Sequence, residues 1–270
     1  MSIDSSTLSL TSWLHVWPLW EIGAAIFASL VALSGLGYHG ARWSRRKRGS
    51  APQGKNGSDG RDFLLTAMLG LMALLLAFTF SLALDRFETR RDLVVTEANA
   101  LETAWMFAQA LQEPDRIIVT KALRNYLEAR VIWSQTYTDR NDMGATKELQ
   151  IPLWNATITA AHNEPTLAIS TGLTTAVSAS FDIATKRLAA RTAKIPDSVL
   201  HTLLLYIAIA VLILGEVTAA HDKKPHHFST TLLLLLLTLA LMIILDLDRT
   251  NSGAIMVSQQ PMLDLWEGAR

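Results

Sequence analysis

Cysteine is absent from this 270-residue sequence, and charged residues make up only 18% of it. Without cysteine, disulfide scaffolds, thiolate zinc sites, iron–sulfur clusters and cysteine nucleophiles are all excluded. The net charge is zero, from 24 basic and 24 acidic residues. A nucleic-acid-binding protein normally has a basic surplus, so nucleic acid is not an expected partner. Soluble domains carry about 25% charged residues, and the deficit here favours a membrane protein.

The missing charge is concentrated in four apolar segments. A hydrocarbon core of about 30 Å requires roughly 20 apolar helical residues to cross it. We expect transmembrane helices at 19–38, 63–84, 199–217 and 229–245. The first 20 residues contain neither lysine nor arginine, so a cleaved signal peptide is not predicted. The sequence therefore predicts a multi-pass membrane protein that begins with an N-terminal segment, 1–18.

Basic residues in the short loops indicate the orientation. The linker at 39–62 contains the run Arg45-Arg46-Lys47-Arg48, and the loop at 218–228 contains Lys223 and Lys224. We expect both to lie in the cytoplasm, where the basic run would contact the anionic lipid bilayer. Both termini and the segment 85–198 would then lie on the outer side of the membrane.

The segment 85–198 reads as a helical extramembrane domain. Between Asp62 and Gln112 there is no proline and a single glycine, Gly70, which predicts one helix that leaves the second span as a stalk. Further helices are expected from Asp115 to about Tyr137, at 147–162 and at 166–193, with a loop at 138–146. The predicted fold class is an all-α integral membrane protein with four transmembrane helices and this helical bundle between the second and third spans.

The stalk has an apolar stripe that should pack on other helices. Its members recur at spacings of three, four and seven: Phe87, Val94, Ala98, Leu101, Trp105 and Ala108. Glu97, Glu102 and the pair Arg90-Arg91 are expected to lie off this stripe.

Motifs for catalysis are missing. The sequence has no P-loop, no dinucleotide-binding glycine pattern, no His-Glu-x-x-His pair and no nucleophile elbow. His221, His226 and His227 fall in one loop and could hold a metal weakly, but a solvated loop is the preferred interpretation. We therefore expect no enzyme activity, no catalytic residue, no metal site and no cofactor.

Three groups of polar residues lie within or at the ends of the predicted membrane spans, where burying a polar group costs free energy. Thr66, Thr79 and Ser81 interrupt the second span, where hydroxyl groups either pack helices together or line a water-filled path. The span ends in a charged collar, which forms either a ring at a pore mouth or an interfacial salt-bridge cluster; its members are Asp85, Arg86, Glu88, Arg90 and Arg91.

The third polar feature is the start of the C-terminal tail. Asp246, Asp248 and Arg249 follow the fourth span directly. We predict that the two aspartates pair with Arg86, Arg90 or Arg91. The tail, 246–270, is too apolar to be simply disordered and is expected to dock on the bundle or on the membrane surface.

Three runs of this sequence resemble the bacterial bestrophin-like family. They are LGLMALLLAFTFSLALDRFETRRDLVVTEANAL from Leu69, IPDSVL from Ile195, and LDLDRTNSGAIMVSQQPMLDL from Leu245. The resemblance implies a place in the bacterial inner membrane, with the helical domain and both termini on the periplasmic side by the charge argument above. Bestrophins proper are pentameric chloride channels with four membrane helices per subunit, and their second span lines the pore.

The resemblance further implies a homo-oligomeric, anion-conducting pore, whose partners are copies of itself, lipid and inorganic ions. Phe78 and Phe80 would form an apolar gate, with Thr79 and Ser81 beside them and Asp85, Arg86 and Arg90 at the mouth. The sequence lacks the aromatic, proline-containing neck of bestrophins. The alternative is a membrane-anchored sensor or scaffold whose bundle binds a ligand or an envelope partner. A closed ring of subunits would favour the channel, and a sealed dimer would favour the scaffold.

Overall fold

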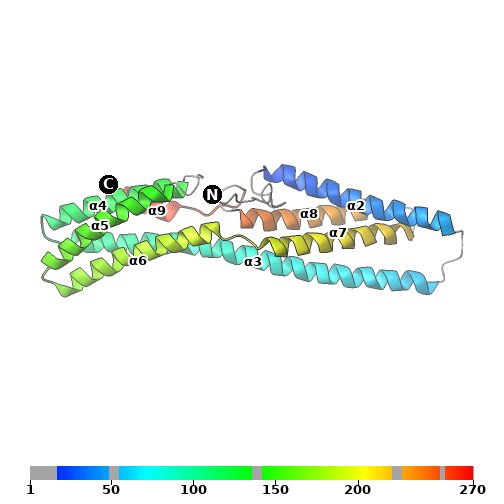
Figure 1. The fold of residues 1–270 in the computed structure, drawn as a ribbon, viewed down its shortest axis with the longest axis horizontal. Coiled ribbons are helices and arrows are strands. Elements are labelled where there is room, and N and C mark those ends of the chain that lie inside the picture. The colour runs from blue at the N-terminus through cyan, green and yellow to red at the C-terminus, as the bar shows by residue number, and fades with distance from the viewer. Residues whose placement is uncertain (1–16, 49–54, 136–141, 221–226, 250–252, 270) are drawn as a thin grey trace, which may run out of the picture. The chain divides into compact units, whose positions relative to one another are not determined.

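A computed structural model of the chain describes residues 17–48, 55–135, 142–220, 227–249 and 253–269 (Figure 1). Every regular element in these ranges is a helix, so the predicted all-α fold class is confirmed. The helices are α2 (Leu19–Arg48), α3 (Lys55–Gln109), α4 (Asp115–Gln135), α5 (Asp142–Asn163), α6 (Leu167–Thr192), α7 (Asp197–Ala220), α8 (His227–Asp248) and α9 (Gln260–Gly268).

Four of the described helical segments are long and apolar enough to cross a membrane. They are Leu19–Lys47, Gly60–Gln109, Leu167–Ala219 and Phe228–Asp248. The third of these covers α6 and α7, and the predicted span at 199–217 lies within α7. Each of the four predicted spans falls inside one of these segments, which gives the architecture of a four-span, all-α membrane protein.

Helix α3 is a single 55-residue helix. At 1.5 Å per residue it is about 80 Å long, because no proline interrupts it before Pro114. The uninterrupted helix predicted from Asp62 onward is therefore confirmed. The chain divides into two compact units, with a boundary between Asp85 and Arg86, so α3 contributes residues to both.

Unit 1 comprises Met1–Asp85 and Lys194–Ile255. Here α2 packs against α7 and α8 (Figure 1). The contact between α2 and α7 depends on glycine, because a Cβ added at Gly37 would lie 2.1 Å from the Leu212 carbonyl oxygen. A Cβ at Gly215 would likewise lie 2.1 Å from the Ser34 carbonyl oxygen. Small residues thus let two membrane helices approach backbone to backbone.

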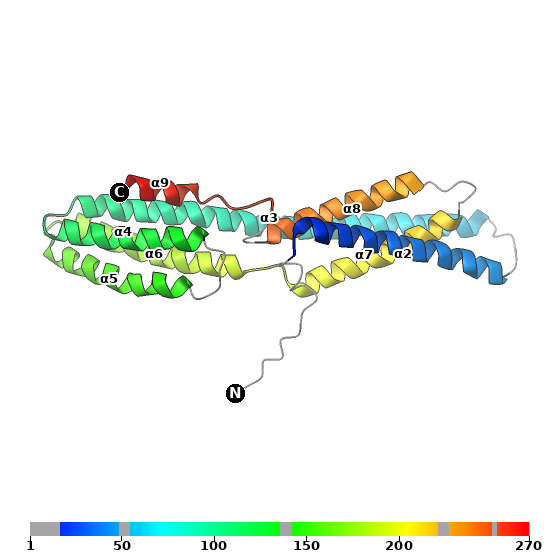
Figure 2. The same ribbon diagram turned by 90° about the horizontal axis from the view of Figure 1, so that it is seen from above.

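Unit 2 comprises Arg86–Ala193 and Met256–Arg270. In it α4 packs on α5 (Figure 2), α5 on α6, and α9 on α4. Met262 of α9 is fully buried in the core of this unit. Arg124 of α4 donates from Nε to the Ala269 carbonyl oxygen at 2.8 Å. The C-terminal residues therefore complete the core of the bundle.

The helix boundaries differ from the sequence prediction in two places. Helix α5 begins at Asp142 rather than at 147, so part of the predicted loop is helical, and Pro152 lies inside the helix. Helices α2 and α3 also extend into the predicted linker at 39–62, as far as Arg48 and from Lys55.

Candidate functional site

One face of the membrane part of α3 packs within unit 1. Leu65 and Met72 are buried on this face. The Tyr206 hydroxyl of α7 donates to the Met68 carbonyl oxygen at 3.3 Å, and Arg61 pairs with Glu216 of α7 at 3.2 Å. These contacts fix which side of α3 faces its own subunit.

The opposite side of α3 carries a stripe of small side chains. Successive residues of an α-helix turn by about 100°, so spacings of three and four keep side chains on one face. The residues of this stripe, which we call the small face, are all exposed in the single chain: Thr66, Gly70, Ala73, Ala77 and Ser81. The small face thus lies on the side of α3 away from α7, although bulky residues such as Leu71, Leu74 and Phe78 are exposed beside it.

The four predicted pore residues do not share one direction. Phe78 is 66% exposed and Phe80 is 39% exposed, but residues two apart on a helix differ in direction by about 200°. They therefore flank the small face on opposite sides. Thr79 is buried, and its hydroxyl donates to the Leu75 carbonyl oxygen at 2.8 Å. Only Ser81 of the four belongs to the small face.

The charged residues of the collar on α3 differ in exposure. The arginines at 86 and 90 are half-buried and buried, respectively, whereas exposed positions carry both signs. The exposed charged residues between 85 and 92 are Asp85, Glu88, Arg91 and Asp92. The exposed part of the collar is therefore acidic on balance.

The polar residues at the end of α8 bind backbone groups of unit 1. The Asp246 carboxylate accepts the N–H groups of Ala254, at 3.0 and 3.2 Å to its two oxygens, and of Ile255 at 3.0 Å. A Cβ at Gly253, where φ is +157°, would lie 1.9 Å from Asp246 Oδ1. This turn therefore requires both the carboxylate and the glycine.

Asp248 and Arg249 tie the same end of α8 to two other segments. Asp248 Oδ1 accepts the Ile195 N–H at 2.8 Å, just before α7. Arg249 Nη2 donates to the Trp17 carbonyl oxygen at 2.8 Å, just before α2. These bonds anchor the helix ends of unit 1. The pairing of Asp246 and Asp248 with the arginines of α3 stays a prediction.

Unit 2 contains a buried ion cluster that the sequence analysis missed. Glu97 of α3 accepts hydrogen bonds from Arg130 of α4, at 2.5 Å from Nε and 3.0 Å from Nη2. It also accepts one from Arg187 Nη1 of α6. Glu97 and Arg130 are fully buried, and Arg187 is nearly so. The expectation that Glu97 lies off the apolar stripe is therefore wrong.

Helical spacing was the signal that could have located the cluster. Glu97 follows Val94 by three residues and precedes Leu101 by four, and both neighbours are buried. Arg130 follows Tyr126 by four residues in the same way. A charged residue at a core position on each of two helices indicates a buried ion pair, because an unpaired buried charge is rarely tolerated.

Trp133 of α4 lies beside the arginines of the cluster. The guanidinium carbon of Arg130 is 4.2 Å from its ring centroid, that of Arg191 is 4.7 Å away and that of Arg187 is 5.3 Å away. Burial lowers the pKa of Arg187, and attraction by Glu97 opposes this effect. Arg187 Nη2 also donates to Gln259 Oε1 at 2.8 Å, which connects the cluster to the segment before α9.

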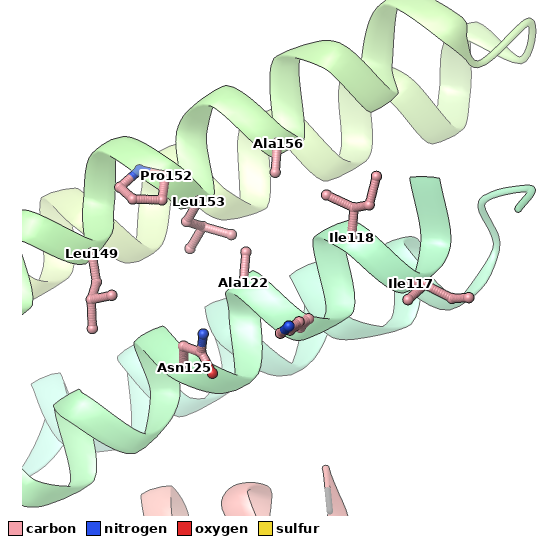
Figure 3. A pocket seen from close by; sticks show the side chains of 9 residues that line it. Ile117, Ile118, Ala122, Asn125, Leu149, Pro152, Leu153 and Ala156 are labelled. Carbon is pink, nitrogen blue, oxygen red and sulfur yellow. The ribbon is translucent and has the colours of Figure 1, made fainter. Parts of the chain in front are cut away.

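A groove lies between α4 and α5 in the same unit (Figure 3). Its volume is about 480 Å³, and its lining is mainly apolar. The lining includes Ile117, Ile118 and Ala122 from α4, and Leu149, Pro152 and Leu153 from α5. Lys121 and Asn125 of α4 are its polar lining residues.

Metal-binding groups do not gather in the part of the chain that the structure describes. No group of three histidine, aspartate or glutamate side chains there could hold an ion. The histidine-rich loop singled out in the sequence, with His221, His226 and His227, lies outside the side chains described.

Comparison with known proteins assigns the chain to a family. The family model of the Bestrophin-like domain matches residues 25–262, which run from α2 into α9. No curated protein and no solved structure matches the chain. Because the family match covers most of the sequence and both units, the chain belongs to the bestrophin-like family.

Proposed function

We propose that this protein forms a homo-oligomeric membrane pore in which the small faces of α3 from several copies surround a central axis. The observation that carries the proposal is the division of α3 into a face packed on α7 and an exposed face of small and hydroxyl side chains. Membership of the bestrophin-like family supports it, since bestrophins proper are channels lined by their second span.

The physical basis is the lipid environment. Apolar side chains gain little by leaving lipid for another helix, so membrane helices associate where small residues permit close contact. The small face offers this contact over Gly70, Ala73 and Ala77. In a ring of helices the same small side chains leave room along the axis, and the hydroxyl groups of Thr66 and Ser81 can contact water there.

The sign of the exposed charge bears on the permeant ion. The family resemblance implies anion conduction, but the exposed collar of α3 carries three acidic residues and one arginine between residues 85 and 92. Acidic rings at a pore mouth favour cations. We therefore expect the proposed pore to prefer cations, with Asp85 and Glu88 at its mouth and the half-buried Arg86 contributing less.

The pore proposal is tested by conductance with a matched pair of substitutions. Ala77→Phe places a ring on the small face, and Leu71→Phe places one on an exposed position of α3 about 120° away. Purified protein in planar bilayers should give unitary currents that Ala77→Phe reduces at least about tenfold, because the ring narrows the path of the ion. Leu71→Phe should leave them within about twofold. The proposal would be contradicted if bilayers that contain confirmed oligomers gave no unitary currents, or if the two variants reduced the currents equally.

The expected membrane placement belongs to the same proposal. The loops at 39–62 and 218–228 would lie in the cytoplasm of a bacterial cell, with unit 2 and both termini in the periplasm. Alkaline phosphatase fused after Arg270 should then be active, because it folds only outside the cytoplasm. An inactive fusion combined with an active β-galactosidase fusion at the same point would reverse this orientation.

A membrane-anchored sensor or scaffold is the second candidate, and the groove between α4 and α5 favours it (Figure 3). An apolar ligand or envelope partner would bind along Ile118, Ala122 and Leu153. The two candidates differ in subunit arrangement. Cryo-EM of the protein in nanodiscs should show a closed ring with a continuous axial path for the pore, whereas a sealed dimer would favour the scaffold.

A further inference from the structure

The buried ion cluster of unit 2 carries more positive than negative charge. Two guanidinium groups, Arg130 and Arg187, share the single carboxylate of Glu97. Glu97 and Arg130 have no exposed side-chain surface, and Arg187 is 6% exposed. The carboxylate thus balances one arginine and leaves about one positive charge in a low-dielectric environment, which is costly unless another group compensates for it.

No other residue of the cluster supplies the missing negative charge. Besides burial, the groups that act on the pKa of Arg187 are Glu97, which attracts its charge, Arg130, which repels it, and Tyr126. Tyr126, one turn before Arg130, is the remaining ionisable group that interacts electrostatically with the cluster. Burial raises the pKa of its phenol, so this side chain stays neutral at physiological pH.

Arg130 also has a hydrogen-bonding group without an acceptor. Its Nε and Nη2 form the edge of the guanidinium that faces Glu97. Nη1 lies on another edge of the same rigid plane, and this atom is buried without a hydrogen-bond partner. A buried polar atom of this kind requires an explanation such as a bound water or ion.

The missing acceptor and the missing negative charge coincide at one atom. We propose that Arg130 Nη1 binds a small inorganic monoanion of the chloride class within unit 2. A water molecule would accept the hydrogen bond but would leave the excess positive charge unbalanced. A monoanion would accept the hydrogen bond and also balance the charge. The site is separate from the proposed pore and does not depend on conduction.

The test measures thermal unfolding of the full-length protein in detergent as a function of chloride. Sodium gluconate replaces sodium chloride at constant ionic strength, so that screening stays fixed while the small anion is varied. A ligand that binds only the folded state raises the unfolding temperature according to its concentration relative to Kd. We expect a saturable rise with chloride, and the same with bromide. Unfolding temperatures that do not differ between chloride and gluconate would overturn the proposal.

Three variants locate the effect. Arg130→Lys removes Nη1 but keeps the charge, and should abolish the saturable rise. Arg124→Met removes an exposed guanidinium from the same helix and should leave it unchanged. Glu97→Gln keeps both arginines and removes the negative charge of the cluster, so it should lower the chloride concentration for half-saturation roughly tenfold. An unchanged chloride response in Arg130→Lys and Glu97→Gln would overturn the assignment.

A direct measurement covers the case in which Arg130→Lys does not fold. Crystals of the wild-type protein grown in bromide should give an anomalous scattering peak beside Arg130 Nη1. The absence of that peak, with bromide visible elsewhere in the lattice, would overturn the proposal regardless of the behaviour of the variants.

Discussion

At the residue scale, Asp246 has a role that its position at the end of a membrane span does not suggest. Its two oxygens accept three backbone hydrogen bonds, from Ala254 and Ile255, and its side chain is only 3% exposed. Charge-assisted bonds of this kind are about twice as strong as neutral ones. Gly253 lies so close to the Asp246 carboxylate that a residue with a side chain has no space at position 253.

Replacing this carboxylate should weaken unit 1. Asp246→Asn keeps the shape but places an amide donor where one of the oxygens accepts from the backbone, so we expect a loss of about 1.5–3 kcal/mol in stability. Thermal or denaturant unfolding in detergent measures this loss. Asp182→Asn, at an exposed position of α6, is the control and should change stability by less than about 0.5 kcal/mol. Equal effects would show that the carboxylate does not hold the turn.

The pairing of the residues in the ion cluster could not be predicted from the sequence. Charged residues in an amphipathic helix are ordinarily assigned to solvent, and Glu97 was assigned in this way. Its partners Arg130 and Arg187 lie 33 and 90 residues further along the chain. One sequence does not reveal that three helices bring these charges together, although the position of each within its own apolar stripe could be calculated.

At the element scale, long helices were the easiest features to predict. Helix α3 follows from the absence of proline over about fifty residues, and its end follows from Pro114. The start of α5 at Asp142 was missed because Asp, Gly and Asn there indicate a loop by composition alone. Helix α9 has only nine residues, too few to form a stable helix in isolation. It is stabilised by packing on α4, which no local signal reveals.

The contact between α2 and α7 gives a prediction that depends on two glycines of one helix. Gly37→Leu would drive a side chain into the backbone of α7 at Leu212, whereas Gly35→Leu would enter open space. Overpacking of this kind costs about 1–3 kcal/mol or separates the helices. We expect Gly37→Leu to lower the unfolding temperature in detergent and Gly35→Leu to leave it within error. The same loss in both variants would show that glycine is not needed for close approach.

At the scale of the whole molecule, the absence of cysteine makes the proposed assembly directly testable. A single cysteine at Ala77, on the small face, should form disulfides between copies in oxidised membranes, because the proposed axis brings these faces together. A cysteine at Leu71 should crosslink at least about fivefold less, since it lies about 120° away on the helix. Non-reducing gel electrophoresis measures both. More crosslinking at Leu71 than at Ala77 would place a different face of α3 toward the axis.

The order of the two units along the chain has a consequence for biosynthesis. The chain builds α2 and the first part of α3 for unit 1, then most of unit 2, then α7 and α8 for unit 1, and only afterwards the segment Met256–Arg270 of unit 2. Met262 occupies the core of that bundle. During translation, the bundle therefore waits with an unfilled hydrophobic site until both later spans have left the ribosome. A chain that stalls before α9 is made therefore lacks the side chain that fills this site.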